Sequence, residues 1–276
     1  MLLYKTATTS VLEFDGDWYR IDRAWDEMLN DDNLYEYLNG CVGSHPPDDA
    51  LAETVADTLP PSGNQEIWAA GVTYLKSKAA RMDESKDAGG GDFYDRVYDA
   101  TRPEIFFKAN AARTVGNNDW LRLRIDSKWI VPEPELTLVI TSSGKIVGYT
   151  IGNDLSCRDI EGENPLYLPQ AKTFDRCAAV GPAILVTQQH PSPETEIRMK
   201  ILRGGKEIIN EATKLSQMKR GLEELVEFVF RDNAHPSGCF LMTGTGVIPP
   251  DDFSLVEGDV IEIEIDGIGK LVNSVK

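Results

Sequence analysis

Glu133-Pro134-Glu135 leads into the alternating run Leu136-Thr137-Leu138-Val139-Ile140, and a second run, Lys145 to Ile151, follows the turn Ser142-Ser143-Gly144. Two such runs on either side of a glycine-containing turn predict an antiparallel β-hairpin. Residues i and i+2 of an extended chain point to the same face, so Glu133 and Glu135 would bring two like charges together. This pairing is unfavourable unless a cation lies between the two carboxylates.

A third carboxylate, Asp154, lies at the end of the strand that returns from this hairpin. Three carboxylates supply the oxygen ligands that a hard divalent ion prefers. The sequence therefore predicts a metal site formed by Glu133, Glu135 and Asp154. The alternative interpretation is that these acids only cap hairpins on a solvated acidic surface.

Strands outnumber helices along the rest of the chain, and most of them occur as hairpins. Asp15-Gly16 separates two strand-like runs, and Gly204-Gly205 separates two more. Helical spacing is confined to a few segments, such as 74–85 and 218–231. This pattern predicts an α+β fold that is mostly β, an antiparallel-rich roll or barrel and not a doubly wound parallel sheet.

The stretch Pro60-Pro61-Ser62-Gly63-Asn64 is the best candidate for a linker, because proline and glycine interrupt both helices and strands. We therefore expect a small N-terminal domain over residues 1–62 and a catalytic domain over residues 63–276.

The composition excludes several classes of partner. The net charge is −17, from 45 acidic and 28 basic residues, which disfavours binding to nucleic acid or to anionic membranes. No run approaches the roughly 18 apolar residues of a membrane span, and the first residues do not resemble a signal peptide. The four cysteines lack metal-binding spacing, so we expect reduced thiols in a cytoplasmic enzyme.

Four motifs in this order resemble the fumarylacetoacetate hydrolase superfamily. They are Glu133 to Leu136, Gly148 to Asp159, the Lys172 segment that leads to Gly181-Pro182, and Thr243 to Gly246. The resemblance runs from about residue 66 to the C-terminus and implies the fold of that family, a mixed β-roll or sandwich, for the catalytic domain. Residues 97–109, 132–136 and 163–172 further resemble the superfamily members that dehydrate 2-keto-3-deoxy sugar acids.

By this resemblance, Glu133, Glu135 and Asp154 bind Mg2+, with Mn2+ or Ca2+ as substitutes. The implied substrate is a small 2-keto acid of the 2-keto-3-deoxy-D-arabinonate type, and the implied product is 2,5-dioxopentanoate. The metal would stabilise the enolate that forms when carbon 3 loses a proton. Glu133, Glu135 and Lys172 are the expected catalytic residues, and Lys172 either pairs with a substrate oxygen or acts as a base.

Four further residues are expected to contact the substrate: Ser77, Phe107, Lys108 and Thr245. Thr245 lies in a Thr-Gly-Thr-Gly turn, which can present backbone N–H groups and a hydroxyl to a carboxylate. Arg158 and Asp159 are expected to form a supporting ion pair.

Ser77 stands where the carbon–carbon hydrolases of the superfamily have a histidine that activates water. A serine hydroxyl cannot serve as a base near neutral pH without help. The three histidines, His45, His190 and His235, are all expected on the surface. The sequence therefore favours a reaction that needs no activated water.

Several alternatives remain open at this point. An acylpyruvate or diketo-acid hydrolase with a different base, or an oxo-acid decarboxylase or isomerase, would use the same enolate chemistry. A non-catalytic binding protein that keeps the fold is a different class, but the three carboxylates argue against it. The family implies a homodimer or homotetramer, and the sequence leaves open whether the glycines at 89–91 belong to a lid.

Overall fold

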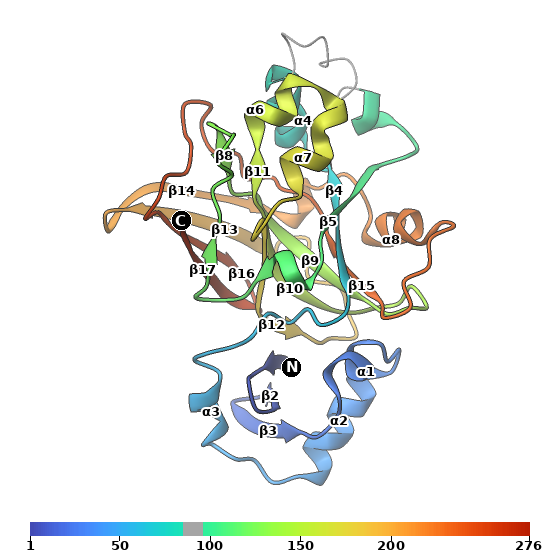
Figure 1. Cartoon of the computed structure of the whole chain (residues 1–276). Coiled ribbons are helices and arrows are strands. Elements are labelled where there is room, and N and C mark those ends of the chain that lie inside the picture. The colour runs from blue at the N-terminus through green and yellow to red at the C-terminus, as the bar shows by residue number, and fades with distance from the viewer. Residues whose placement is uncertain (85–95) are drawn as a thin grey trace.

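The computed structural model describes residues 1–84 and 96–276, so the glycines at 89–91 lie outside the described residues. The chain folds around one large sheet and one smaller sheet, and short helices lie at both ends (Figure 1).

The large sheet is mixed and has ten strands in the order β3-β2-β1-β12-β10-β9-β15-β4-β5, with β6 beside β12. Its strands are β1 (Leu2–Lys5), β2 (Ser10–Phe14), β3 (Asp17–Ile21), β4 (Glu66–Gly71), β5 (Glu104–Ala109), β6 (Thr114–Val115), β9 (Pro134–Ile140), β10 (Ile146–Asp154), β12 (Ala178–Leu185) and β15 (Cys239–Met242). Every residue of β9 is buried, and only Glu135 and Thr137 interrupt its apolar side chains.

The smaller sheet has five strands in the order β14-β13-β16-β17-β7. They are β7 (Trp120–Leu121), β13 (Glu196–Arg203), β14 (Lys206–Lys214), β16 (Val260–Ile265) and β17 (Gly269–Val275), and a separate pair joins β8 (Ile130–Val131) to β11 (Ser156–Cys157). Along β16, Ile261, Ile263 and Ile265 are buried and alternate with half-buried residues, so one face turns inward. Strands β16 and β17 contact β10 and β12 of the large sheet, and the apolar core lies between the two sheets.

The helices are short. They are α1 (Trp25–Leu29), α2 (Leu34–Ser44), α3 (Leu51–Thr54), α4 (Leu75–Glu84), α6 (Arg158–Glu163), α7 (Leu168–Lys172) and α8 (Leu222–Phe230), with 3-10 turns at Ala111–Arg113, Pro165–Tyr167 and Leu215–Gln217. Figure 1 shows α4, α6 and α7 together at one end of the sheets, with the N-terminal unit at the opposite end. The prediction of an α+β fold that is mostly β is confirmed.

The N-terminal unit extends the large sheet. Strand β1 pairs antiparallel with β12, with Leu2 opposite Leu185 and Leu3 opposite Ile184. The division into domains at residues 62 and 63 stays a prediction. None of the helices in the described part of the chain is both long and apolar enough to cross a membrane.

Candidate metal centre and active site

Glu133, Glu135 and Asp154 lie together where the β9–β10 hairpin reaches α6 and α7. The antiparallel register places Gly152 opposite Glu135, and the Asp154 N–H donates to the Glu133 carbonyl at 3.0 Å. One oxygen from each of the three carboxylates lies within 4.8 Å of the others, and all three residues are buried. The structure thus brings the three predicted metal ligands together.

Each carboxylate is held from outside through one of its two oxygens. The Lys108 ammonium lies 2.5 Å from Asp154 Oδ1, and the Arg158 guanidinium donates to Glu133 Oε1 at 2.8 Å. The Gly244 backbone N–H donates to Glu135 Oε2 at 2.5 Å. These three contacts restrain one oxygen of each carboxylate, and we call the other three, Glu133 Oε2, Glu135 Oε1 and Asp154 Oδ2, the inner oxygens.

Lys172 lies among those inner oxygens. It is the last residue of α7, and its side chain is 1% exposed. Its ammonium is 2.8 Å from Glu133 Oε2, 3.2 Å from Asp154 Oδ2 and 2.6 Å from Ser156 Oγ. The Phe106 ring closes the remaining side, with its centroid 5.6 Å from Lys172 Nζ.

The carboxylates differ in electrostatic environment. Burial, followed by the charges of Asp154 and Glu133, raises the pKa of Glu135 well above its ordinary value. Burial also acts to raise the pKa of Asp154, but the ammonium groups of Lys108 and Lys172 outweigh it and lower that pKa. Within the described part of the chain, Glu135 is therefore the ligand without an ion pair, and its carboxylate is held by the Gly244 backbone N–H.

The residues present fit a hard divalent cation. Among the residues that the structure describes, the site offers three carboxylates and neither thiolate nor imidazole, which is the donor set of Mg2+, Mn2+ or Ca2+ and not of Zn2+ or copper. A divalent ion beside Glu135 would also supply the positive charge that this carboxylate lacks.

A fourth acid, Glu104, was missed by the sequence analysis. Strand alternation places it on the same face of β5 as Phe106 and Lys108, both of which face the carboxylate group. Its Oε2 is buried without a hydrogen-bond partner, close to the Cα of Gly71, where a Cβ would lie 2.0 Å away. The signal in the sequence was the i, i+2, i+4 spacing of Glu104, Phe106 and Lys108.

The four predicted substrate contacts have different surroundings. Lys108 lies in the site but contacts Asp154 and backbone carbonyls. The Phe107 ring packs edge-on against Trp68, with centroids 5.9 Å apart, so the structure does not bring it into the group.

The hydroxyls of Ser77 and Thr245 both bond to nearby backbone. Ser77 Oγ donates to the Tyr74 carbonyl and accepts from the Tyr74 N–H, at the start of α4. Thr245 Oγ1 donates to the Val247 carbonyl and accepts from its N–H. In the turn that includes Thr245, it is the Gly244 N–H that reaches a carboxylate, and this carboxylate belongs to Glu135.

Two other sequence expectations are corrected. Arg158 pairs with Glu133 and not with Asp159, whose carboxylate accepts from Ser127 and from the Lys128 backbone. His235 is buried, not on the surface, because its ring packs against Trp68 and Phe230.

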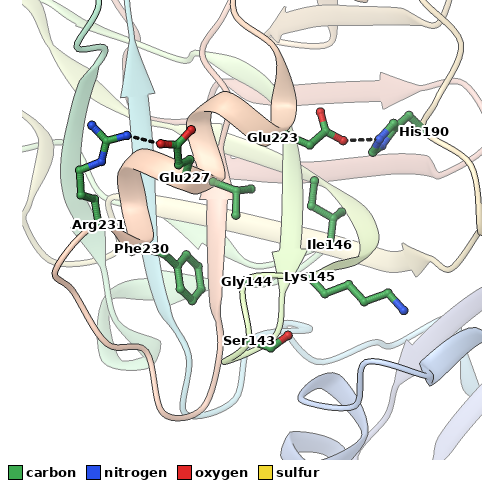
Figure 2. A pocket seen from close by; sticks show the side chains of 10 residues that line it. Ser143, Gly144, Lys145, Ile146, His190, Glu223, Glu227, Phe230 and Arg231 are labelled. Carbon is green, nitrogen blue, oxygen red and sulfur yellow. Dashed lines mark hydrogen bonds and ion pairs between the residues drawn. The ribbon is translucent and has the colours of Figure 1, made fainter.

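A cavity of about 700 Å³ lies at the other end of the β9–β10 hairpin, beside the turn that contains Lys145 and beside α8 (Figure 2). There His190 Nε2 contacts Glu223 at 2.5 Å, and its Nδ1 is 2.5 Å from the Tyr149 hydroxyl. Ile146, at the start of β10, lines this cavity, whereas Asp154 lies at the end of the same strand. The cavity and the carboxylate group are therefore separate sites.

The family profile described as fumarylacetoacetate (FAA) hydrolase C-terminal matches residues 66–276. The chain is 49% identical over 229 residues to "Probable 2-keto-3-deoxyxylonate dehydratase" of Haloferax volcanii, covering 83% of this chain and 77% of that protein. It is 42% identical over 213 residues to "2-dehydro-3-deoxy-D-arabinonate dehydratase" of Saccharolobus solfataricus, covering 76% and 72%.

A solved structure described as "2-keto-3-deoxy-D-arabinonate dehydratase complexed with magnesium and 2,5-dioxopentanoate" superposes with a TM-score of 0.83 and 34% identity. The superposition covers 100% of this chain and 98% of that chain. The resemblance and the fold predicted from the sequence are therefore confirmed. The chain belongs to the fumarylacetoacetate hydrolase family.

Proposed function

We propose that this chain is a Mg2+-dependent dehydratase that converts a 2-keto-3-deoxy sugar acid of the 2-keto-3-deoxy-D-arabinonate type to 2,5-dioxopentanoate. The observation that carries the proposal is the buried group of Glu133, Glu135 and Asp154, with Lys172 among its inner oxygens. Two relatives above 40% identity bear dehydratase names, and a superposing structure contains magnesium and the dioxo acid.

Glu133, Glu135 and Asp154 are the residues that would hold the metal. When bound, Mg2+ supplies a Lewis acid that polarises a 2-keto group and acidifies the protons on the adjacent carbon 3. The protein residues must then accept a proton from carbon 3 and direct the departure of the hydroxyl on carbon 4.

Glu104 is our candidate for the proton acceptor. Its carboxylate has a buried oxygen without a partner and lies on the site face of β5. Lys172 is our candidate for holding a substrate oxygen, because its ammonium is the cation that lies among the inner carboxylate oxygens. Loss of the carbon 3 proton and the carbon 4 hydroxyl releases one water, and tautomerisation then gives the aldehyde at carbon 5.

The arrangement does not favour hydrolysis by activated water. Ser77 bonds to the Tyr74 backbone, where the hydrolases of the family have a histidine. The three histidines of the chain contact other groups: His45 the Cys41 carbonyl, His190 Glu223, and His235 Glu66. None of these contacts involves the carboxylate group. None of the three histidines is therefore placed by these contacts to act as a general base that activates water at this site.

We also propose a homodimer or homotetramer in the cytoplasm. Family membership supports the homo-oligomer, and four free cysteines, three of them buried, support a reducing compartment. Light scattering on purified protein tests the assembly, and a monomer at micromolar concentration would contradict it.

The function is tested by incubating purified protein with Mg2+ and 2-keto-3-deoxy-D-arabinonate and following 2,5-dioxopentanoate by chromatography. We expect turnover that EDTA abolishes and added Mg2+ restores. Cleavage of an acylpyruvate, without turnover of any 2-keto-3-deoxy acid, would replace the dehydratase by the hydrolase alternative.

A further inference from the structure

We propose that Lys108 is a positioning residue that holds Asp154 and Lys172 in place and does not contact the substrate. The two buried lysines of the site would then have separate roles. The inference deepens the proposed function and rests on it for the identity of the substrate.

The Lys108 ammonium makes two hydrogen bonds to backbone carbonyls and one ion pair with Asp154. It donates to the Leu155 carbonyl at 2.9 Å and to the Lys172 carbonyl at 2.5 Å, and it lies 2.5 Å from Asp154 Oδ1. An ammonium has three hydrogens to donate, and three oxygens surround this one. The side chain is also 0% exposed, and the oxygens that contact its ammonium all belong to the protein, so Lys108 acts on the site through Asp154 and the backbone.

These three contacts connect the elements that carry Asp154 and Lys172, whose relative positions determine the geometry of the site. Asp154 and Leu155 are consecutive residues at the end of β10, and Lys172 ends α7. The Lys172 carbonyl belongs to the last turn of its helix and needs a donor from outside. Lys108 supplies this donor from β5, so one side chain joins β5, β10 and α7.

Lys108 and Lys172 contact different oxygens of Asp154, and this difference separates their roles. Lys108 contacts Oδ1, whereas Lys172 contacts Oδ2, the oxygen that turns toward Glu133. A cation on the inner oxygens competes with a metal ion for them. A cation on the outer oxygen instead orients the carboxylate, as outer-sphere partners of metal ligands do.

The two roles predict opposite effects on metal affinity. Removing a competing ammonium should leave Mg2+ affinity unchanged or tighten it, since the inner oxygens lose a rival. Removing an orienting ammonium should weaken it, although the deletion also removes a positive charge near the metal. We therefore expect Lys108→Met to weaken Mg2+ binding by roughly 10–100-fold, and its matched control, Lys172→Met, not to weaken it.

The experiment is titration calorimetry of MgCl2 into EDTA-stripped wild type, Lys108→Met, Lys108→Arg and Lys172→Met, combined with steady-state kinetics at saturating Mg2+. Lys108→Arg keeps the charge and several donors, so it should recover part of the Mg2+ affinity. Both Lys108 variants should lower kcat by a much larger factor than they change KM for the 2-keto acid, because Lys108 itself does not contact the substrate and acts only through Asp154 and Lys172.

Unchanged or tighter Mg2+ binding in Lys108→Met would overturn the proposal, as would a raised KM with an unchanged kcat. If Lys108→Met does not fold, Lys108→Arg decides by the same criteria: weaker Mg2+ binding with unchanged KM supports positioning, and the reverse excludes it. Absence of dehydratase turnover in the wild type would contradict the proposed function, whereas the calorimetry would still decide the role of Lys108.

Discussion

At the scale of single residues, the pKa values of two buried carboxylates in the metal centre are shifted in opposite directions. Asp154 faces two ammonium groups, and its pKa is lowered, whereas Glu135 faces Asp154 and Glu133, and its pKa is raised. Burial alone acts in the same direction on both acids. The charges around each carboxylate therefore account for the opposite directions of the two pKa shifts.

Glu135→Gln should lower turnover by orders of magnitude and stabilise the metal-free protein at neutral pH. An unfolded glutamate loses its proton near pH 4.3, whereas folded Glu135 keeps it to higher pH because its pKa is raised. The folded state then binds more protons than the unfolded state, so its stability declines as the pH rises through this window.

Urea unfolding in EDTA at pH 5 and pH 8 measures this effect. The stability advantage of Glu135→Gln over wild type should be larger at pH 8. Glu133→Gln is a less suitable control, since Lys172 and Arg158 both contact Glu133. An unaltered turnover rate in Glu135→Gln would contradict the assignment of this residue as a ligand.

Glu104→Gln should lower kcat by roughly 10²–10⁴-fold, the usual contribution of a general base, and should leave Mg2+ affinity unchanged. The amide keeps the shape of the side chain but cannot accept the proton from carbon 3. The matched control is Glu66→Gln, on the neighbouring strand β4, where the carboxylate accepts from the Trp68 indole. Full activity in Glu104→Gln would assign proton transfer to another group.

At the scale of elements, the sequence predicts local pairs and misses distant ones. The β9–β10 hairpin and its i, i+2 carboxylates follow from alternation and a short turn, and both are found. The pair between Arg158 and Glu133 joins residues 25 positions apart. Its geometry depends on how α6 packs above the hairpin, which no local pattern encodes, and the sequence analysis gave Arg158 the wrong partner.

His190 connects two elements, β10 and α8, and should matter for stability only. It accepts from or donates to the Tyr149 hydroxyl of β10 and contacts Glu223 of α8. His190→Ala leaves the largely buried phenol without this partner, which should lower the free energy of unfolding by about 1–3 kcal/mol. Thermal unfolding and kcat measure the two effects, and His45→Ala, at an exposed position, is the control. A large loss of kcat without loss of stability would show that this region communicates with the carboxylates.

At the scale of the whole molecule, the net charge of −17 opposes the compact state by self-repulsion. Raising the ionic strength shortens the Debye length from about 10 Å at 0.1 M to about 3 Å at 1 M. We therefore expect Tm to rise with KCl concentration at constant Mg2+. Sucrose at equal osmolality is the control for solute exclusion, and a Tm that is independent of KCl would show that the surface charges are already compensated.

The overall architecture was predictable to the level of fold class, because hairpin spacing and alternation are local properties of the chain. The pairing of β1 with β12 was not, because it joins Leu2 to Leu185 across most of the sequence. Glu104 was missed for a similar reason: its place on the site face depends on β5 lying in the same sheet as β9, with β15 and β4 between them.

The balance of charge inside the site has a consequence for how the protein matures. Three acids, Glu133, Glu135 and Asp154, are accompanied by three bases, Lys108, Lys172 and Arg158, all of them buried. Ion pairs with these bases offset the charge of Glu133 and Asp154, and the raised pKa of Glu135 favours its neutral form, so we expect the chain to fold without an ion. The apoprotein can therefore persist as a folded reserve, and the supply of magnesium can switch it on afterwards without any new protein being made.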